Sequence, residues 1–133
     1  MNRLYAAISS GVLVATLAFA PVASAVGMES GFTTPSGNIA CEADLNENGT
    51  RALHCVLFSA SGTRGEKTWS MRPRGRAIVR YVQANVATET PTLRYGKTWR
   101  WHGITCTSRK SGLTCRNTAG HGWFLSRQRQ RIF

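Results

Sequence analysis

The residues best suited to acid–base chemistry in this chain are its histidines and a few carboxylates. Histidine titrates near neutral pH, so a histidine placed beside a carboxylate or an arginine is the arrangement that a small basic nuclease would use. The candidates for such a site are His102 or His121 with Glu42, Glu66 or Glu89. No spacing selects one set of them, and the chain lacks the G-x-S-x-G motif of many serine hydrolases. The sequence leaves an enzyme uncertain and favours a protein without catalytic residues.

The sequence positions of His121 and His54 favour structural roles. His121 lies between Gly120 and Gly122, which would let a ligand approach the backbone closely. The same three residues suit a tight turn in which the histidine bonds its own loop, and we favour the turn. His54 directly precedes Cys55 on an expected strand, so the two side chains should point to opposite faces. We interpret His54 as a surface or cross-strand residue.

Two tryptophans alternate with polar residues in the segment Trp99-Arg100-Trp101-His102. On a strand, Trp99 and Trp101 would share one face. If that face were exposed, the indoles would stack on sugars or bases. If it were buried, they would fill the core beneath a basic outer face, and we favour the core. Together with His121, these two tryptophans are the candidate ligand-contacting residues.

Two groups of alternating arginines are candidate anion-binding residues. They are Arg72, Arg74 and Arg76 in the middle of the chain, and Arg127, Arg129 and Arg131 near its end. An extended backbone would place each group on one side. A solvated loop and a charged edge strand, which resists pairing with another chain, are the alternatives. Because residues 90–133 contain nine basic and no acidic residues, we expect a net basic face.

This charge pattern points to an anionic partner. Without its first 25 residues the chain has sixteen basic and six acidic residues, a net charge of +10. We expect a non-enzymatic domain that binds a cell-wall polymer, a nucleic acid or an acidic protein by salt-sensitive electrostatic contacts. The alternatives are a secreted hydrolase, with a nuclease as the leading case, and a structural envelope protein without a specific ligand. No motif indicates a cofactor, and we expect none.

The first 25 residues have the features of a secretory signal peptide. Arg3 supplies a positive start, residues 6–20 carry no charge, and Ala23-Ser24-Ala25 offers a cleavage site. A membrane span needs about 20 apolar residues, and this run is shorter. We expect residues 26–133 to form a single domain, secreted or in the cell envelope or periplasm, with no membrane span after processing.

All four cysteines lie in this expected domain: Cys41, Cys55, Cys106 and Cys115. An even number in a small exported chain predicts disulfides. A three-residue hairpin loop at Glu47-Asn48-Gly49 places the first two cysteines opposite each other. A four-residue loop at Arg109-Lys110-Ser111-Gly112 does the same for the last two, and facing residues lie within the Cα separation of a disulfide. Zinc would need closer pairs such as C-x2-C, so we expect no metal site.

Short segments with strand-forming residues recur between turn signals along the domain. They cover residues 38–45, 51–59, 67–71, 76–84, 98–108, 113–117 and 122–127. The segment 76–84 also fits a short helix. The whole pattern predicts an all-β fold, a small antiparallel sandwich or barrel-like meander with two disulfide-stapled hairpins.

The segment Gly31-Phe32-Thr33-Thr34-Pro35-Ser36-Gly37-Asn38-Ile39-Ala40-Cys41 resembles the opening motif of a family of small secreted bacterial domains of unknown function, DUF6636. Four later segments occur in the family's order: Leu93-Arg94-Tyr95-Gly96, Cys106-Thr107-Ser108, residues 112–117 and residues 120–127. The resemblance covers about residues 31–133. Typical members carry a further cysteine pair in the middle, which this chain lacks, so the family's properties transfer least to residues 63–89. The resemblance implies an exported, disulfide-bonded domain and supplies no catalytic residues.

Overall fold

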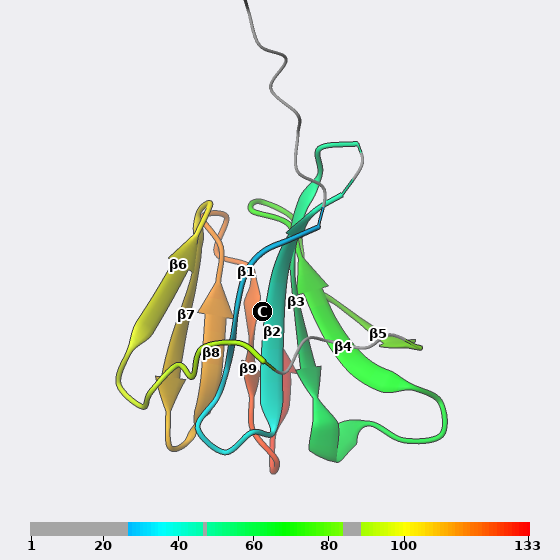
Figure 1. Ribbon diagram of the computed structural model, residues 1–133, viewed down its shortest axis with the longest axis vertical. Helices are drawn as coiled ribbons and strands as arrows, with labels where there is room; N and C mark the ends of the chain where they lie inside the picture. The colour runs from blue at the N-terminus through cyan, green and yellow to red at the C-terminus, as the bar shows by residue number, and fades with distance from the viewer. Residues whose placement is uncertain (1–26, 47, 84–88) are drawn as a thin grey trace, which may run out of the picture.

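The computed structural model describes residues 27–46, 48–83 and 89–133 (Figure 1). The expected signal peptide, Glu47 of the first hairpin loop, and Ala84 at the end of the segment 76–84 lie outside these ranges. Within them, the elements are ten β-strands and one 3₁₀ turn, Phe58–Ala60. The all-β prediction is confirmed. The same residues contain no helix long and apolar enough to cross a membrane.

The strands form two antiparallel sheets, in each of which every strand pairs with its neighbour in sequence. The first sheet contains β1 (Gly27–Thr33), β2 (Ile39–Leu45), β3 (Arg51–Leu57), β4 (Glu66–Met71) and β5 (Ile78–Val82). The second contains β6 (Thr98–Trp101), β7 (Ile104–Arg109), β8 (Gly112–Arg116), β9 (Gly122–Leu125) and β10 (Gln130–Ile132). In Figure 1 the yellow-to-orange strands β6–β8 lie to the left of the cyan-to-green strands β2–β5.

The inner faces of the two sheets share one hydrophobic core. Alternate residues along the strands point into it, as the two-residue period of a strand requires. Trp69 of β4 and Trp123 of β9 are its largest side chains, with 1% and 0% of their surface exposed. Other members come from both sheets: Phe32, Ile39, Leu53, Leu57, Met71, Ile104, Leu113 and Leu125. The chain is therefore a two-layer sandwich.

Both disulfides join directly opposed residues on adjacent strands, as the hairpin geometry predicts. Cys41 of β2 faces Cys55 of β3 with a Cα–Cα distance of 4.1 Å, and Cys106 of β7 faces Cys115 of β8 at 4.0 Å. All four cysteines are fully buried in the shared core. Gly49, in the first loop, has the expected left-handed backbone, with a φ of 75°.

The second hairpin loop is shorter than predicted. Arg109 pairs with Gly112, so only Lys110 and Ser111 form the loop. The cysteines still face each other, because the additional Arg109–Gly112 pair leaves the register of the other residue pairs in the hairpin unchanged.

Several expected strand limits are corrected. The segment 98–108 is two strands, separated by a tight turn at His102 and Gly103 with φ values of 40° and 82°. Glycine adopts this left-handed backbone without strain, and histidine is tolerated there. The turn was not predicted because the alternating Trp99-Arg100-Trp101-His102 pattern is typical of an unbroken strand. The segment 51–59 ends as a strand at Leu57. The segment that also fitted a helix contains β5, a strand.

Strand β1 was not predicted, because its sequence GMESGFT lacks a clear alternation of apolar and polar residues. It becomes a strand by pairing with β2 along most of its length.

The close packing of β8 on β9 yields a stability prediction. A Cβ atom on Gly122 would lie 1.9 Å from the backbone oxygen of Cys115, so Gly122→Ala must push two paired strands apart. We expect it to lower the free energy of unfolding by more than about 2 kcal/mol, the scale of an overpacked core. The matched control is Gly62→Ala, whose Cβ would enter open space and should change stability by less than about 1 kcal/mol. Denaturant unfolding followed by tryptophan fluorescence measures both, and equal midpoints would contradict the strand packing.

Candidate functional site

The outer face of the second sheet carries arginine and threonine side chains in register across its strands. We call it the arginine–threonine face and define it by Thr98, Arg100, Thr105, Thr107, Arg109, Thr114, Arg116, Phe124 and Arg131. One cross-strand row runs Thr98, Thr107, Thr114, Phe124, Arg131, and a second runs Arg100, Thr105, Arg116. The four arginines are exposed, and the residues between these positions point into the core. Residues 90–133 contain no carboxylate side chain, so no acidic side chain of this sheet offsets the charge of these arginines.

Aromatic rings hold three arginines close to this face. The guanidinium carbon of Arg116 lies 4.5 Å from the ring centre of Phe133, and that of Arg131 lies 5.5 Å from the same ring. Arg129 lies 5.1 Å from the ring of Phe124. Each contact is a cation–π interaction, worth about 0.5–1 kcal/mol at an exposed site. Two cations on one ring repel each other, so the approach of an anion relieves their repulsion.

The predicted C-terminal arginine stripe is divided by the β9–β10 turn. Arg127 and Arg129 lie in the turn, which is closed by a hydrogen bond from Ser126 N to Arg129 O of 2.8 Å. Arg131 lies on the edge strand β10. Arg129 and Arg131 therefore join the arginine–threonine face through their aromatic contacts, and Arg127 is exposed in the turn.

The predicted middle stripe lies in the loop between β4 and β5, where Arg72, Arg74 and Arg76 are all exposed. The buried side chain of Asn117 fastens this loop to the second sheet. Its amide nitrogen donates hydrogen bonds to Arg72 O at 3.0 Å and Gly75 O at 2.7 Å.

The same Asn117 side chain also organises the turn that contains His121. Its amide oxygen accepts hydrogen bonds from the backbone nitrogens of Ala119 and His121, both at 3.1 Å. His121 is half-buried in this β8–β9 turn. One amide side chain thus joins the arginine loop of the first sheet to the histidine turn of the second.

The two candidate tryptophans lie on edge strand β6, half-buried against the core. Trp99 packs on Phe32 with ring centres 5.2 Å apart, and its indole nitrogen donates a hydrogen bond to Ser30 Oγ at 3.1 Å. Trp101 stacks on Trp99 at 6.3 Å. Both indoles are on the inner side of the sheet, so they do not share a surface with the arginine–threonine face.

The nuclease candidates are divided between the two sheets. Glu42 and Glu66 lie on β2 and β4 of the first sheet, whereas His102 and His121 lie in turns of the second. His102 packs edge-on against Trp101, with ring centres 5.0 Å apart. Across the described ranges, no carboxylate lies within 4.0 Å of His121. Nor does any group of three histidine, cysteine or acidic residues there lie close enough to hold a metal ion.

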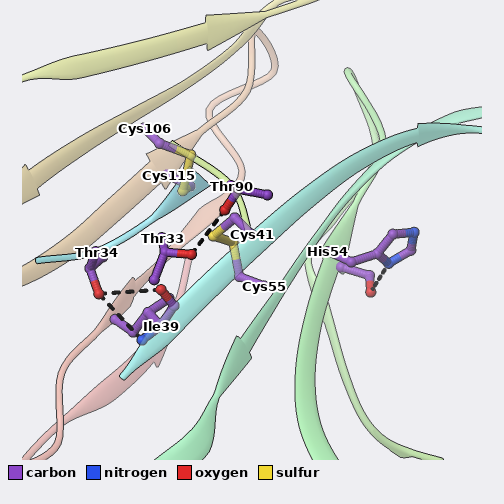
Figure 2. The surroundings of a disulfide bond; sticks show 10 residues. Thr33, Thr34, Ile39, Cys41, His54, Cys55, Thr90, Cys106 and Cys115 are labelled. Carbon is purple, nitrogen blue, oxygen red and sulfur yellow. Dashed lines mark hydrogen bonds between the residues drawn. A yellow bond between two sulfur atoms is a disulfide. The ribbon is translucent and has the colours of Figure 1, made fainter. Parts of the chain in front are cut away.

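Sequence reasoning missed a polar cluster on the outer face of the first sheet. His54 Nδ1 lies 2.7 Å from Ser70 Oγ, and its Nε2 lies 3.4 Å from Asp44 Oδ2. Figure 2 shows His54 on the opposite side of β3 from the Cys41–Cys55 disulfide. The three residues come from three strands and share no local motif. Continuing the hairpin register from the disulfide would have placed Glu42 opposite His54 and Asp44 diagonally next to it.

Serine, histidine and aspartate also form the catalytic triad of many hydrolases, in which backbone N–H groups stabilise the oxyanion. Ser70 lies within β4, between β3 and β5, so the N–H groups around it face neighbouring strands. The contacts with Ser70 and Asp44 hold the His54 ring in place, while the backbone N–H groups around Ser70 are directed at the neighbouring strands.

The hydrogen bonds of Asn117 predict that replacing it destabilises the protein more than replacing its exposed neighbour, Thr118. Asn117→Ala leaves two backbone carbonyls and two N–H groups without their partner. We expect it to lower the free energy of unfolding by about 2–4 kcal/mol. Thr118, which is exposed, bonds Pro73 O of the same loop at 3.2 Å. Thr118→Ala should cost about 1 kcal/mol or less. Chemical denaturation of both variants measures the difference in the free energy of unfolding. An equal loss in the two variants would show that Asn117 is not the main contact holding the loop between β4 and β5.

A comparison with protein-family models supports the family resemblance. The model described as "Family of unknown function (DUF6636)" matches residues 66–133, which run from β4 through the arginine loop and the whole second sheet. The match is shorter than the expected 31–133 and does not include the opening motif. Searches of curated proteins and of solved structures found no match. Because the matched segment is half of the chain, the chain belongs to the DUF6636 family, whose function is unknown.

Proposed function

We propose that this protein binds an anionic polymer outside the membrane through its arginine–threonine face, without catalysing a reaction. The observation that carries the proposal is the pair of arginines, Arg116 and Arg131, held on the single ring of Phe133 in a sheet without carboxylate side chains. Arginine presents a planar fork of donors that matches phosphate and carboxylate groups. A rigid sheet fixes the positions of these forks before any ligand arrives.

The spread of the arginines favours a polymer over a small anion. Arg100 lies on β6, Arg116 on β8 and Arg131 on β10, at opposite edges and in the middle of the sheet. Neighbouring strands are about 4.8 Å apart, so these charges extend over about 19 Å. A single phosphate could engage only one part of the face, whereas a chain of repeated anionic groups could engage all of it. The threonine hydroxyls between the arginines supply further hydrogen-bond donors.

The aromatic contacts favour recognition by charge over recognition by base stacking. Phe124 and Phe133 each have an arginine over the ring, which occupies a surface that a nucleobase would otherwise stack on. A phosphate- or carboxylate-bearing polymer of the cell envelope fits this face better than a nucleic acid read by its bases.

The salt dependence of binding tests this proposal. The probes are long-chain inorganic polyphosphate and poly-L-glutamate, titrated over a series of salt concentrations. Each phosphate neutralised contributes roughly 0.7–0.9 to the slope of log affinity against log salt. We expect the triple variant Arg100→Gln/Arg116→Gln/Arg131→Gln to make the slope for polyphosphate shallower by about 2–3.

The matched control is Arg72→Gln/Arg74→Gln/Arg76→Gln, which removes the same net charge from the loop between β4 and β5. It should change the slope by less than about 1. Equal effects of the two triple variants would show that net charge, and not this face, controls binding. Incubation with RNA and DNA completes the test, because cleavage that is lost in His121→Ala or His102→Ala would contradict a non-enzymatic role.

A further inference from the structure

The outer face of the first sheet, on the other side of the sandwich, is hollowed into a cavity of about 690 Å³. We call it the first-sheet cavity. A row of directly paired residues crosses it over four strands: Glu42, His54, Ser70 and Ile78. The volume lies within the roughly 300–1,000 Å³ typical of small-ligand sites, and the arginine–threonine face plays no part in it.

Charges of opposite sign line opposite ends of this cavity. Strand β2 supplies the carboxylates of Glu42 and Asp44, whereas the arginines come from the far side, Arg80 on β5 and Arg72 and Arg76 in the preceding loop. Within the described part of the chain, none of these three arginines lies within 4.0 Å of a carboxylate. The paired strands keep the two groups apart, so they cannot neutralise each other.

The distance between the ends limits the ligand that could bridge them. Strands β2 and β5 are three strand spacings apart, about 14 Å. An extended peptide rises about 3.3–3.6 Å per residue, so three or four residues separate an amino terminus from a carboxylate by about 10–14 Å. A single amino acid is too short to reach both ends. A uniform polyanion would meet the β2 carboxylates and be repelled by them.

The middle of the cavity suits small side chains and a polar backbone. Ala52 of β3 provides apolar surface and Thr68 and Ser70 of β4 provide hydroxyl groups, while Ile78 and Val82 add apolar surface on either side of Arg80 on β5. His54 is held between Ser70 and Asp44, so the cavity wall at this point is ordered without a ligand. An apolar lining with a few fixed polar groups is typical of pockets for small molecules.

We propose that the first-sheet cavity binds a short peptide with free termini, three or four residues long and with small side chains. Its ammonium group lies against Glu42 and Asp44, and its carboxylate lies against Arg76 and Arg80. The site is independent of the polymer-binding face, and neither proposal depends on the other.

Calorimetric titration of the full chain with three peptides tests the proposal. The probes are tetra-alanine, N-acetyl-tetra-alanine and tetra-alanine amide, at neutral pH and physiological salt. Each blocked terminus removes one charge contact, and we expect each to weaken binding at least about tenfold relative to the free peptide, or about 1.4 kcal/mol. Equal binding of the three peptides, or no saturable binding of tetra-alanine, would overturn the proposal.

Variants at each end assign the orientation. Arg76→Gln/Arg80→Gln should bind the free peptide and the amide equally, while still binding the acetylated peptide more weakly. Glu42→Gln/Asp44→Asn should show the reverse, with no discrimination against the acetyl group. The proposed orientation is wrong if either variant still discriminates against both blocked peptides. It is also wrong if both variants lose discrimination against the same blocked terminus.

The control variant Arg116→Gln/Arg131→Gln lies on the opposite face and should leave tetra-alanine affinity unchanged while weakening polyphosphate binding. This control separates the two proposals, because each binding activity is measured with its own probe. Unfolding midpoints of all variants confirm that the compared proteins are folded.

Discussion

The fold depends on the burial of one face of each sheet against the other. A strand has two faces, and in this protein the inner faces of both sheets join in a single core around Trp69, Trp123 and the two disulfides. Since inward positions such as Leu53, Trp69 and Trp123 are committed to that core, the residues next to them on the same strands must point outward. The outer faces are thereby made rigid, and their polar side chains are arranged by strand register.

This constraint gives the two outer faces different chemistry. All six acidic residues precede residue 90, so no carboxylate side chain comes from the second sheet. The second sheet consequently presents arginine and threonine around Phe124, which is why we propose an extended polyanion as its ligand. The first-sheet cavity has carboxylates on its β2 side and arginines on its β5 side, which is why we propose for it a ligand that carries both signs as well.

Hydrogen bonds of one side chain, Asn117, connect loops of the two sheets whose positions the packing of the core alone would not fix. The four hydrogen bonds of Asn117 reach the arginine loop of one sheet and the histidine turn of the other. Each disulfide closes a hairpin within one sheet and stabilises it by about 3 kcal/mol in the chain-entropy model. Burying an amide side chain costs little free energy when all of its hydrogen bonds are made, and much more when they are missing. The hydrogen bonds of Asn117 therefore favour one arrangement of these two loops.

The all-β class, the cysteine pairing and the basic second half follow from the sequence by itself, because strand alternation, hairpin loops and charge content are local properties. The turn at His102 and strand β1 could not be read from it, since one is hidden in an alternating pattern and the other exists only through pairing with β2. The cluster of Asp44, His54 and Ser70 was decided by tertiary structure, as was the placement of Arg116 and Arg131 on Phe133. Asp44, His54 and Ser70 lie on three different strands, and Arg116 lies on β8 whereas Phe133 follows β10, so the register and twist of the paired strands bring these distant residues within a few ångströms of one another.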